Sequence, residues 1–418
     1  MNILFVDMYS NLAGHTRTAT TIAQALQRRA HEVSFAVVEG SNTHIIAEAG
    51  FKMYPVSASW AGQYPALEQL IHALHERGEV DVVHSFDKRG VPEVTRAAKA
   101  LGIPVFYTIC GGKPPRTALE MKPIISLSHE VKAALVEKTS LRENDIEVIP
   151  ARLDFASMLS SVDDDSEERY KRFREKYALP HTSRIVLRIA RVSKKYKDGL
   201  LQGADAVTRL HKEGFDVRFV HIGYIPPENR SDFEEVQARF SALNRAAGTT
   251  VAVSAQDEAP QAPDYLGLAD IVMGLGRTVF EGMLFEKPVV LVGELGFAGL
   301  VGRDDTEQLA FYNFAGRHLK GAKPYDQSVA ELTGTLRELL KDEALRTQVG
   351  AFGKTYVLEN LDANVAAARY EALYESFSPD DYPSDEQIAA FIRVTPRRVV
   401  RALLPEAVRR YYQKVRYS

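Results

Sequence analysis

The residues with the clearest chemical potential form a glycine turn between a strand and a helix. The β-branched run from Asp270 to Met273 predicts a strand, and Gly274-Leu275-Gly276 predicts the tight turn that follows it. A helix is expected from Arg277 to Phe285, before a second strand from Val289 to Val292. Glycines let a ligand approach the backbone, and the unpaired N–H groups at a helix N-terminus favour an anion such as phosphate.

Three side chains near the start of this helix could hold a ligand. Glu281 lies one turn inside the helix, where its carboxylate could accept hydrogen bonds from ligand hydroxyls. The hydroxyl of Thr278 either caps the helix or holds a phosphate, and Arg277 adds a cation. Phosphate donors together with one carboxylate fit a nucleotide-sugar better than a bare anion.

The spacing from Met273 through Gly276 to Glu281 resembles the donor-site motif of GT-B glycosyltransferases, and most closely that of the retaining family 4 enzymes. The resemblance implies that Glu281 holds the ribose hydroxyls of a nucleotide-sugar. In the family an earlier Glu contacts the transferred sugar, and Met273 stands at that position here. A Rossmann-like turn with a chance Glu is the alternative that this motif alone leaves open.

Arg191 and Lys197 follow the first strand of the second half of the chain, in the sequence ARVSKKYKDG. The resemblance implies that an Arg and a Lys at about this spacing clamp the donor diphosphate. Fixed cations would stabilise the negative charge that grows on a departing nucleoside diphosphate. Lys194 and Lys195 are rivals for the role of the lysine, and loop lysines are commonly only solvated.

The first strand of the chain leads into a second turn that could bind an anion, Tyr9 to His15. Gly14 precedes a helix with Thr residues at its start, an arrangement that favours phosphate. The resemblance implies a glycine-rich loop near the donor phosphates and the acceptor, and Gly14 is the one glycine present. His15 could contact phosphate, although a lone His near a turn is more often a solvent-facing residue.

Three positions differ from the family pattern where sugar contacts are usual. They are Met273, Phe86, which stands where a second His is usual after His84, and Cys110, which stands where a His is frequent. For Cys110 the commoner role is that of a small buried hydrophobe. These three residues favour one alternative function, that of a non-catalytic binding or scaffold protein which keeps the fold.

Length and composition suit a soluble protein of two domains. The chain has 418 residues, 45% hydrophobic and 26% charged, and no segment approaches the roughly 20 apolar residues of a membrane span. The N-terminus shows no signal peptide and the one cysteine predicts a reducing compartment, so a cytoplasmic location is expected. With no metal-ligand motif in the sequence, we expect no metal or other cofactor beyond a UDP- or GDP-linked nucleotide-sugar co-substrate.

Apolar strands alternate with helices along the chain, which predicts mainly parallel sheets covered on both faces. The expected fold is α/β, of the GT-B type, with two Rossmann-like doubly wound domains facing a central cleft. The polar stretch from Ser160 to Arg172 suggests the boundary between them. The predicted parts are an N-terminal acceptor domain at 1–165, a C-terminal donor domain at 175–355, a crossover helix at 356–378 and a basic amphipathic helical tail at 384–418.

The tail carries a charge opposite to that of the rest of the chain. From Gln387 onward it has eight basic residues against one acidic residue, a charge of +7, so that the body carries −10 of the total −3. Ser384 and Gln387 form a capping box, and apolar residues repeat at helical spacing from Val400 to Val415. Residues 387–418 would suit an anionic membrane surface, with packing on the acidic body or on a partner as the alternative. The acidic body argues against nucleic acid as a partner.

These features predict a glycosyltransferase of the hexosyltransferase type. It would move a sugar from a nucleotide-sugar to a hydroxyl of a glycan or lipid-linked acceptor, with retention and without a metal. The expected setting is surface polysaccharide, lipopolysaccharide or glycolipid assembly, in the cytoplasm or peripherally on the inner face of the membrane. A sugar-nucleotide epimerase of the same fold is the second alternative, which NMR of the donor incubated alone would distinguish.

Overall fold

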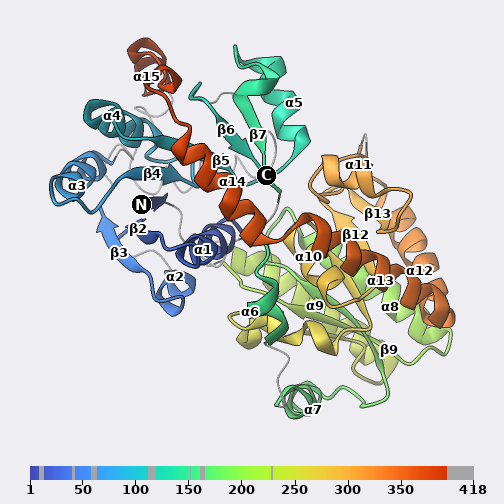
Figure 1. The fold of residues 1–418 in the computed structure, drawn as a ribbon. Helices are drawn as coiled ribbons and strands as arrows, with labels where there is room; N and C mark the ends of the chain where they lie inside the picture. Colours follow the sequence, from blue (N-terminus) through green and yellow to red (C-terminus); the bar gives the residue numbers. More distant parts are fainter. Residues whose placement is uncertain are drawn as a thin grey trace. The chain divides into compact units, whose positions relative to one another are not determined.

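The computed structural model describes residues 1–8, 14–39, 43–57, 64–111, 119–150, 152–160, 165–226, 229–319 and 321–392 (Figure 1). The chain divides into two compact units. Unit 1 comprises Met1–Arg152 and Ala363–Ser418, and unit 2 comprises Leu153–Asp362. The chain therefore leaves unit 1 at Arg152, earlier than the boundary expected from the polar stretch 160–172. Part of that stretch is a helix of unit 2, Ser166–Lys176.

Unit 1 alternates strands and helices from its first residue. Its elements are β1 Asn2–Asp7, α1 Gly14–Gln27, β2 Glu32–Val38, α2 His44–Glu48, β3 Lys52–Val56, α3 Pro65–Glu76, β4 Val82–Ser85, α4 Val91–Leu101, β5 Val105–Ile109, β6 Ile124–Ser126, α5 His129–Lys138, β7 Ile146–Val148, α14 Ala363–Glu375 and α15 Asp385–Ile392.

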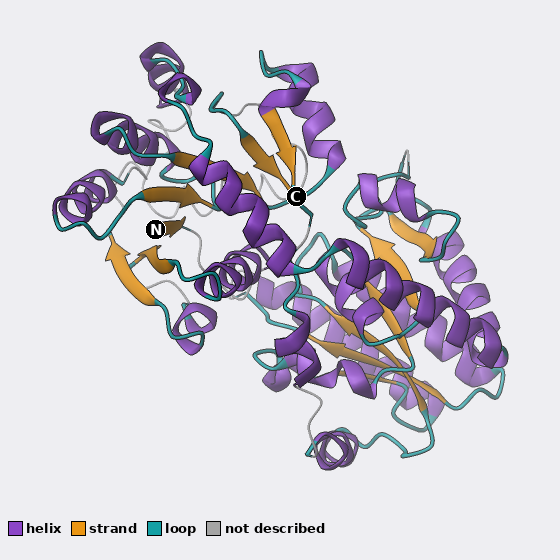
Figure 2. Ribbon diagram, in the orientation of Figure 1, coloured by secondary structure: helices purple, strands orange, loops and turns teal. Residues whose placement is uncertain are grey.

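The sheet of unit 1 is parallel, in the order β3-β2-β1-β4-β5-β6-β7. Its strands are apolar on both faces, because each face packs against a separate hydrophobic cluster. Helices α3, α4 and α5 cover one face, and α1, α2 and α14 cover the other, as the helices on either side of this sheet in Figure 2 illustrate. Strand order reverses between β1 and β4, so the helices that follow these two strands lie on opposite faces.

Unit 2 repeats this plan. Its elements are α6 Phe155–Ser160, α7 Ser166–Lys176, β8 Arg184–Ile189, α8 Lys197–Lys212, β9 Val217–Ile222, α9 Arg230–Ala247, β10 Ala252–Ser254, β11 Ile271–Gly274, α10 Arg277–Leu284, β12 Val289–Gly293, β13 Gly296–Leu300, α11 Thr306–Phe311, α12 Tyr325–Lys341 and α13 Glu343–Asn360.

The sheet of unit 2 has the order β10-β9-β8-β11-β12-β13 and is parallel except for the last pair. Strand β13 runs antiparallel to β12, with an irregularity in the pairing at Leu291 and Val292. Helices α8, α9 and α12 pack on one face, and α7, α10, α11 and α13 pack on the other. The order reverses between β8 and β11. The predicted α/β fold with two Rossmann-like domains is thus confirmed.

The crossover segment differs from the expectation of one helix at 356–378. Helix α13 ends at Asn360, and α14 begins at Ala363 after a break in which Leu361 has φ −125° and Asp362 forms an isolated bridge with Leu153. Asp is a favoured residue before a helix start, which fits a new helix beginning here. The break coincides with the return of the chain from unit 2 to unit 1.

The predicted capping box before α15 is confirmed. The backbone N–H of Gln387 donates to Ser384 Oγ at 3.2 Å, and the backbone N–H of Ser384 donates to Gln387 Oε1 at 2.7 Å. The rest of the basic tail, residues 393–418, lies outside the described residues. Among those that the structure describes, no helix combines the length and the apolar character that spanning a bilayer requires.

Candidate functional site

The carboxyl edge of the sheet in unit 2 is where a ligand is expected from topology alone. In an open α/β sheet, ligands bind outside the carboxyl ends of the strands where the strand order reverses. This point lies between β8 and β11, and the helices that follow them, α8 and α10, begin on opposite faces. Arg191 lies two residues after the end of β8. Gly274 is the last residue of β11, and Gly276 lies in the turn that follows it. The predicted cation and the predicted glycine turn therefore both lie at this edge.

The glycine turn and the end of β8 are in direct contact. The Thr278 hydroxyl donates a hydrogen bond to the carbonyl of Ile189, the last residue of β8, at 3.2 Å. Gly276 has φ +56°, a conformation that side chains rarely adopt, and its N–H donates to Phe314 O at 2.8 Å. Thr278 therefore ties α10 to β8, and the Gly276 N–H has a partner within the protein.

Glu281 is buried on α10 and bonded to Arg277. The Arg277 Nε donates to Glu281 Oε1 at 2.7 Å, four residues along the helix, and both side chains are largely shielded from solvent. The predicted carboxylate and the predicted cation of this helix are therefore one ion pair. In such a pair each partner restrains the rotamers of the other.

The loop between β8 and α8 places two cations around one aromatic ring. Arg191 is exposed, with its Cζ 5.8 Å from the ring centroid of Tyr196, and the Lys195 Nζ is 5.3 Å from the same centroid. Lys195 also forms an ion pair of 3.2 Å with Glu294, the residue after β12. Because β11 lies between β8 and β12, Lys195 reaches across the point where strand order reverses.

Lys197 pairs with carboxylates of the protein, which is not expected of a lysine that binds phosphate. It is the first residue of α8, and its ammonium pairs with Asp232 at 3.2 Å and with Glu235 at 2.5 Å, both on α9. The hydrogen bond to Glu235 raises the pKa of Lys197, so its charge is secure but already compensated. Of the two lysines, Lys195 is the one directed to the β11 side of the edge.

Met273, at the position of the family's first Glu, belongs to the hydrophobic core. It is fully buried in the cluster beneath α8. A Cβ added to Gly203 would lie only 2.6 Å from the Cε of Met273. The methyl group thus fills the space that Gly203 leaves open. A side chain so placed packs the domain, a role that requires no contact with a ligand at the carboxyl edge.

Unit 1 has an equivalent edge where its strand order reverses, between β1 and β4. Asp7, the last residue of β1, is fully buried and accepts a hydrogen bond of 2.8 Å from the Thr16 hydroxyl. His15 Nε2 lies 3.4 Å from the other carboxylate oxygen of Asp7. A Cβ on Gly14 would meet open space, so packing does not require that glycine. The rest of the predicted turn, residues 9–13, lies outside the described residues.

Asp87 adds a second carboxyl group after β4. Its Oδ1 accepts the Arg89 backbone N–H at 3.2 Å, while its buried Oδ2 accepts no hydrogen bond from the described residues. Burial raises the pKa of Asp87, and the hydrogen bond from Arg89 acts in the opposite direction. Together with Asp7 and His15 it gives this edge groups that can bind hydroxyls or exchange protons.

Phe86 and Cys110, two of the altered family positions, have structural environments. Phe86 is buried and stacks on His84, with ring centroids 4.5 Å apart and an interplanar angle of 17°. The Cys110 thiol packs beside the core and points to Thr108 O at 3.8 Å. Burial raises the pKa of Cys110 well above its usual value, so the thiol is protonated and is not a ready nucleophile.

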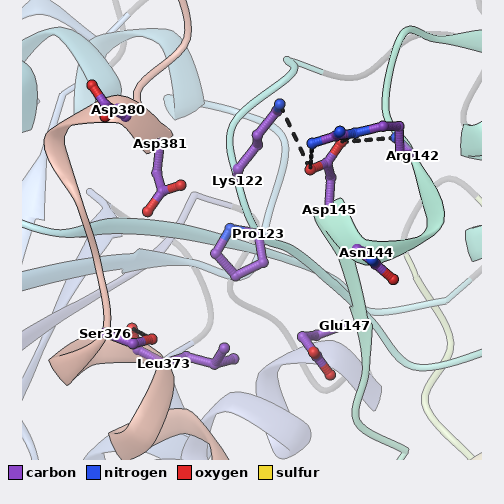
Figure 3. Close-up of a pocket in the computed structure, with 10 residues that line it drawn as sticks. All are labelled: Lys122, Pro123, Arg142, Asn144, Asp145, Glu147, Leu373, Ser376, Asp380 and Asp381. Carbon is purple, nitrogen blue, oxygen red and sulfur yellow. Dashed lines mark hydrogen bonds and ion pairs between the residues drawn. The ribbon is translucent and has the colours of Figure 1, made fainter.

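A polar cavity in unit 1 lies away from this edge. It encloses about 390 Å³ beside the residues that precede β6 and β7, at the amino ends of these strands. Figure 3 shows Lys122 and Arg142 directed at the carboxylate of Asp145, at 3.6 Å and 3.4 Å. Since both cations of its wall, Lys122 and Arg142, are paired with Asp145, and since it lies at the opposite edge from the one where Rossmann-like sheets bind ligands, we do not assign a nucleotide site to it.

Some functional candidates were not apparent from the sequence. Asp7 and Asp87 are strand-end carboxylates, a signal that could have been read from their places after β1 and β4. In the described part of the chain, no three His, Cys, Asp or Glu side chains gather as metal ligands would.

Comparisons with known proteins agree with this architecture. Residues 13–151 match the family model of a glycosyl transferase 4-like domain. The structure is similar to that of Anabaena HepE in complex with UDP and glucose, with a TM-score of 0.66 at 15% identity, covering 90% of this chain and 100% of that one. A glycosyltransferase from Rickettsia africae has a TM-score of 0.68 at 16% identity, covering 89% and 97%. The predicted resemblance to GT-B glycosyltransferases is confirmed.

The same fold also occurs in an epimerase. The UDP-GlcNAc 2-epimerase of Neisseria meningitidis, bound to UDP-GlcNAc, has a TM-score of 0.56 at 12% identity, covering 89% of this chain and 100% of that one. No curated protein sequence matches the chain significantly. At these identities the structural likeness establishes the GT-B fold, and the chemistry has to be argued from the sites.

Proposed function

We propose that this chain, with its glycosyl transferase 4-like residues 13–151 and its GT-B fold, is a glycosyltransferase that uses a nucleotide-sugar donor. The observation that carries the proposal is the contact between the Gly274–Thr278 turn and the end of β8, at the reversal of strand order in unit 2. Solved relatives of this fold hold UDP or a UDP-sugar, which supports a donor of that class.

Unit 2 would bind the donor. Exposed Arg191 and Lys195, gathered around Tyr196, would face the diphosphate, and Arg277 would add a third positive charge. Glu281 would accept hydrogen bonds from the ribose hydroxyls once its pair with Arg277 has adjusted to the ligand. We place Lys195 before Lys197 in this role, because two carboxylates of α9 hold Lys197 away from the edge, whereas Lys195 pairs with Glu294 at the edge itself.

The cations would act on the leaving group. As the bond between the anomeric carbon and the diphosphate breaks, negative charge grows on the phosphate oxygens, and fixed positive charges stabilise it. The acceptor oxygen forms the new bond to the anomeric carbon, and its proton passes to a phosphate oxygen of the departing nucleoside diphosphate. If that transfer occurs on the same face, configuration is retained, as the resemblance to family 4 implies.

Unit 1 would supply the acceptor side. Its edge between β1 and β4 carries His15, Asp7 and Asp87, which can bind or orient a sugar hydroxyl. We propose a hexosyl transfer to a glycan or lipid-linked acceptor in polysaccharide or glycolipid assembly. The basic sequence 387–418 supports a membrane-bound acceptor. Co-sedimentation of the full chain with anionic and neutral vesicles tests this part, since the proposal requires binding to the anionic vesicles alone.

The first experiment measures turnover of a panel of UDP-, GDP- and ADP-linked sugars. The measured product is the released nucleoside diphosphate. Slow hydrolysis of one donor without an acceptor is the expected minimum, because water can replace the acceptor hydroxyl. Binding and hydrolysis of none of the panel would contradict the proposal.

Epimerisation of the donor is the second candidate function, because the UDP-GlcNAc 2-epimerase from Neisseria has a similar structure. An epimerase would convert the sugar of a donor incubated alone, while the nucleoside diphosphate stays attached. A glycosyltransferase would release it instead. One-dimensional NMR of the anomeric proton signals separates these products in a single sample.

A further inference from the structure

Arg188, in the middle of the proposed donor domain, is a buried cation that has no carboxylate partner among the described residues. Its side chain is fully buried, and the strand that carries it, β8, is otherwise apolar from Ile185 to Ile189. The two terminal nitrogens share one acceptor, the carbonyl of Val292, at 3.2 and 3.3 Å. The Nε is buried and has no hydrogen-bond partner among the described residues.

The surroundings of Arg188 are arranged for a guanidinium. A Cβ on Gly199 would lie 3.0 Å from Arg188 Nη2, so the glycine leaves room for the guanidinium beneath the first turn of α8. The pairing of β12 with β13 is irregular at Leu291 and Val292, the place where the acceptor carbonyl lies. The guanidinium therefore lies beneath the loop that carries Arg191, Lys195 and Tyr196.

Neighbouring titratable groups do not neutralise this charge. His221, which pairs with Arg188 in the register of β8 and β9, is fully buried. Its Nε2–H donates to Ala190 O at 2.7 Å, and its Nδ1 is hydrogen-bonded to Ser254 Oγ at 2.8 Å. Burial, together with the charge of Arg188, lowers the pKa of His221 to about 4, so it is neutral. Burial also lowers the pKa of Arg188, to about 10, which still leaves it protonated at neutral pH.

Two further features of this edge favour an anion. The guanidinium lies beneath the N-terminus of α8, a helix of 16 residues, whose dipole adds positive potential at the same place. In the loop above, the Ser193 hydroxyl is buried and has no hydrogen-bond partner within the described chain. A buried charge without a counter-ion is costly, and an anionic ligand at the edge would reduce that cost.

We propose that Arg188 is a buried counter-charge of the donor site, which stabilises the diphosphate of the nucleotide through the protein rather than by touching it. The inference rests on the proposed function, since it names how the same edge recognises its ligand. It predicts that the contribution of Arg188 grows with the charge of the ligand. It also predicts that this contribution persists in high salt, because buried charges are screened less than exposed ones.

The alternative is that Arg188 only ties β8 to the end of β12 through the Val292 carbonyl. That structural role would affect all ligands of the edge equally. A series of nucleoside, nucleoside monophosphate and nucleoside diphosphate distinguishes the two, because the ligands share the base and ribose and differ in charge.

The test uses the full chain with Arg188→Met, and with Arg188→Gln as a second variant if the first folds poorly. Arg218→Met is the matched control. Arg218 is also buried and also has an unpartnered Nε, but it pairs with Asp216 at 3.0 Å near the amino end of β9. Dissociation constants are measured by competition for uridine, UMP and UDP and for the guanosine series, in low and high salt, together with thermal unfolding midpoints without ligand.

We expect Arg188→Met to weaken binding of the diphosphate at least about tenfold, binding of the monophosphate less and that of the nucleoside hardly at all. The midpoint without ligand should stay or rise, because an uncompensated buried charge has been removed. Arg218→Met should lower the midpoint and leave the affinities unchanged. If Arg188→Met weakened binding of all three ligands equally, or of none, the proposed role of Arg188 would be overturned, while the proposed function of the protein would stand. Failure of the wild type to bind any nucleotide would overturn the proposed function and this inference with it.

Discussion

Arg277 and Glu281 are bonded to each other on α10, Nε to Oε1 at 2.7 Å, although the sequence suggested a separate ligand contact for each. In GT-B enzymes of family 4 the position of Glu281 is expected to hold ribose. In this chain the same carboxylate also restrains a cation at the N-terminus of the helix. If Glu281 holds the ligand as proposed, the pair couples the stability of α10 to ligand recognition, and the first prediction separates the two.

Glu281→Gln should lower both stability and nucleotide affinity, because it breaks the partly buried ion pair with Arg277 and removes the proposed acceptor of the ribose hydroxyls. We expect a loss of about 3 kcal/mol in stability and of about tenfold or more in affinity. Thermal unfolding and calorimetric titration with the best nucleoside diphosphate measure the two effects.

The double variant Arg277→Gln, Glu281→Gln is the control for this prediction. It should recover most of the stability, since no unpaired charge remains, but not the affinity. Recovery of affinity as well would mean that Glu281 only supports the helix.

Lys195→Ala should impair catalysis more than Lys197→Ala. Lys195 reaches across the reversal of strand order toward Glu294, whereas Lys197 is held by Asp232 and Glu235 on α9. We expect a loss of about a hundredfold in kcat/KM for Lys195→Ala and much less for Lys197→Ala. Steady-state kinetics on the preferred donor at two salt concentrations gives the comparison. The reverse order of effects would return the diphosphate role to Lys197, as the resemblance implies.

The stability of the protein should fall as the pH drops from 7 to 5. Burial lowers the pKa of His84 to about 3 and that of His221 to about 4, against about 6.5 for an unfolded chain. Below about pH 6.5 the unfolded chain takes up protons at these positions and the folded chain does not, so each His adds a slope of about 1.4 kcal/mol per pH unit. Urea unfolding at several pH values measures the slope.

His84→Gln should reduce that slope by the contribution of one proton, at the cost of some stability from its hydrogen-bonded pairs with Tyr374 and Thr108. His44→Gln is the control for loss of a histidine at the surface, because half of the His44 side chain is exposed. An unchanged slope in His84→Gln would show that this histidine is protonated in the folded chain.

Gly276→Ala should destabilise the donor turn by about 1 to 2 kcal/mol, because the residue has φ +56° and an L side chain is strained there. We expect weaker nucleotide binding in parallel, measured by the ligand-induced shift of the unfolding midpoint. Gly334→Ala, inside α12 and with open space around its Cβ, is the matched control and should stabilise the protein by about 0.5 to 1 kcal/mol. Equal effects of the two substitutions would contradict the role of the turn.

The donor turn could be predicted because local rules determine it. The β-branched residues before Gly274 favour a strand, and Gly276 permits the turn that starts α10, so strand, turn and helix followed from residues close together in the chain. The alternation of strands and helices likewise predicted two Rossmann-like units. Strand β13 was not predicted, because the sequence GFAGL lacks β-branched residues and its pairing depends on β12.

The partners of the charged residues could not be predicted, because they are distant in the sequence. Lys197 meets carboxylates on α9 more than thirty residues away, and Arg188 meets a carbonyl about a hundred residues away. Arg188 is also a charged residue in an otherwise apolar strand. The structure accommodates it because Gly199 has no side chain that would collide with the guanidinium. The spacing in the sequence therefore predicted that the cations lie at this edge, but it could not predict which groups each of them contacts.

The order in which the chain is synthesised gives the break at Asp362 a further meaning. Helix α14 contributes Ala363, Ala366, Tyr370 and Tyr374 to the cluster that α1 and α2 also cover, and its tyrosines contact His84 on β4 and Phe106 on β5. This face of the first sheet therefore stays partly uncovered while residues 153–362 leave the ribosome. The inserted segment has its own clusters and can mature during translation, whereas the segment made first must wait for the helix made after it. A stop codon placed at 363 should accordingly yield a chain whose earliest part, and not its middle, is attacked by protease.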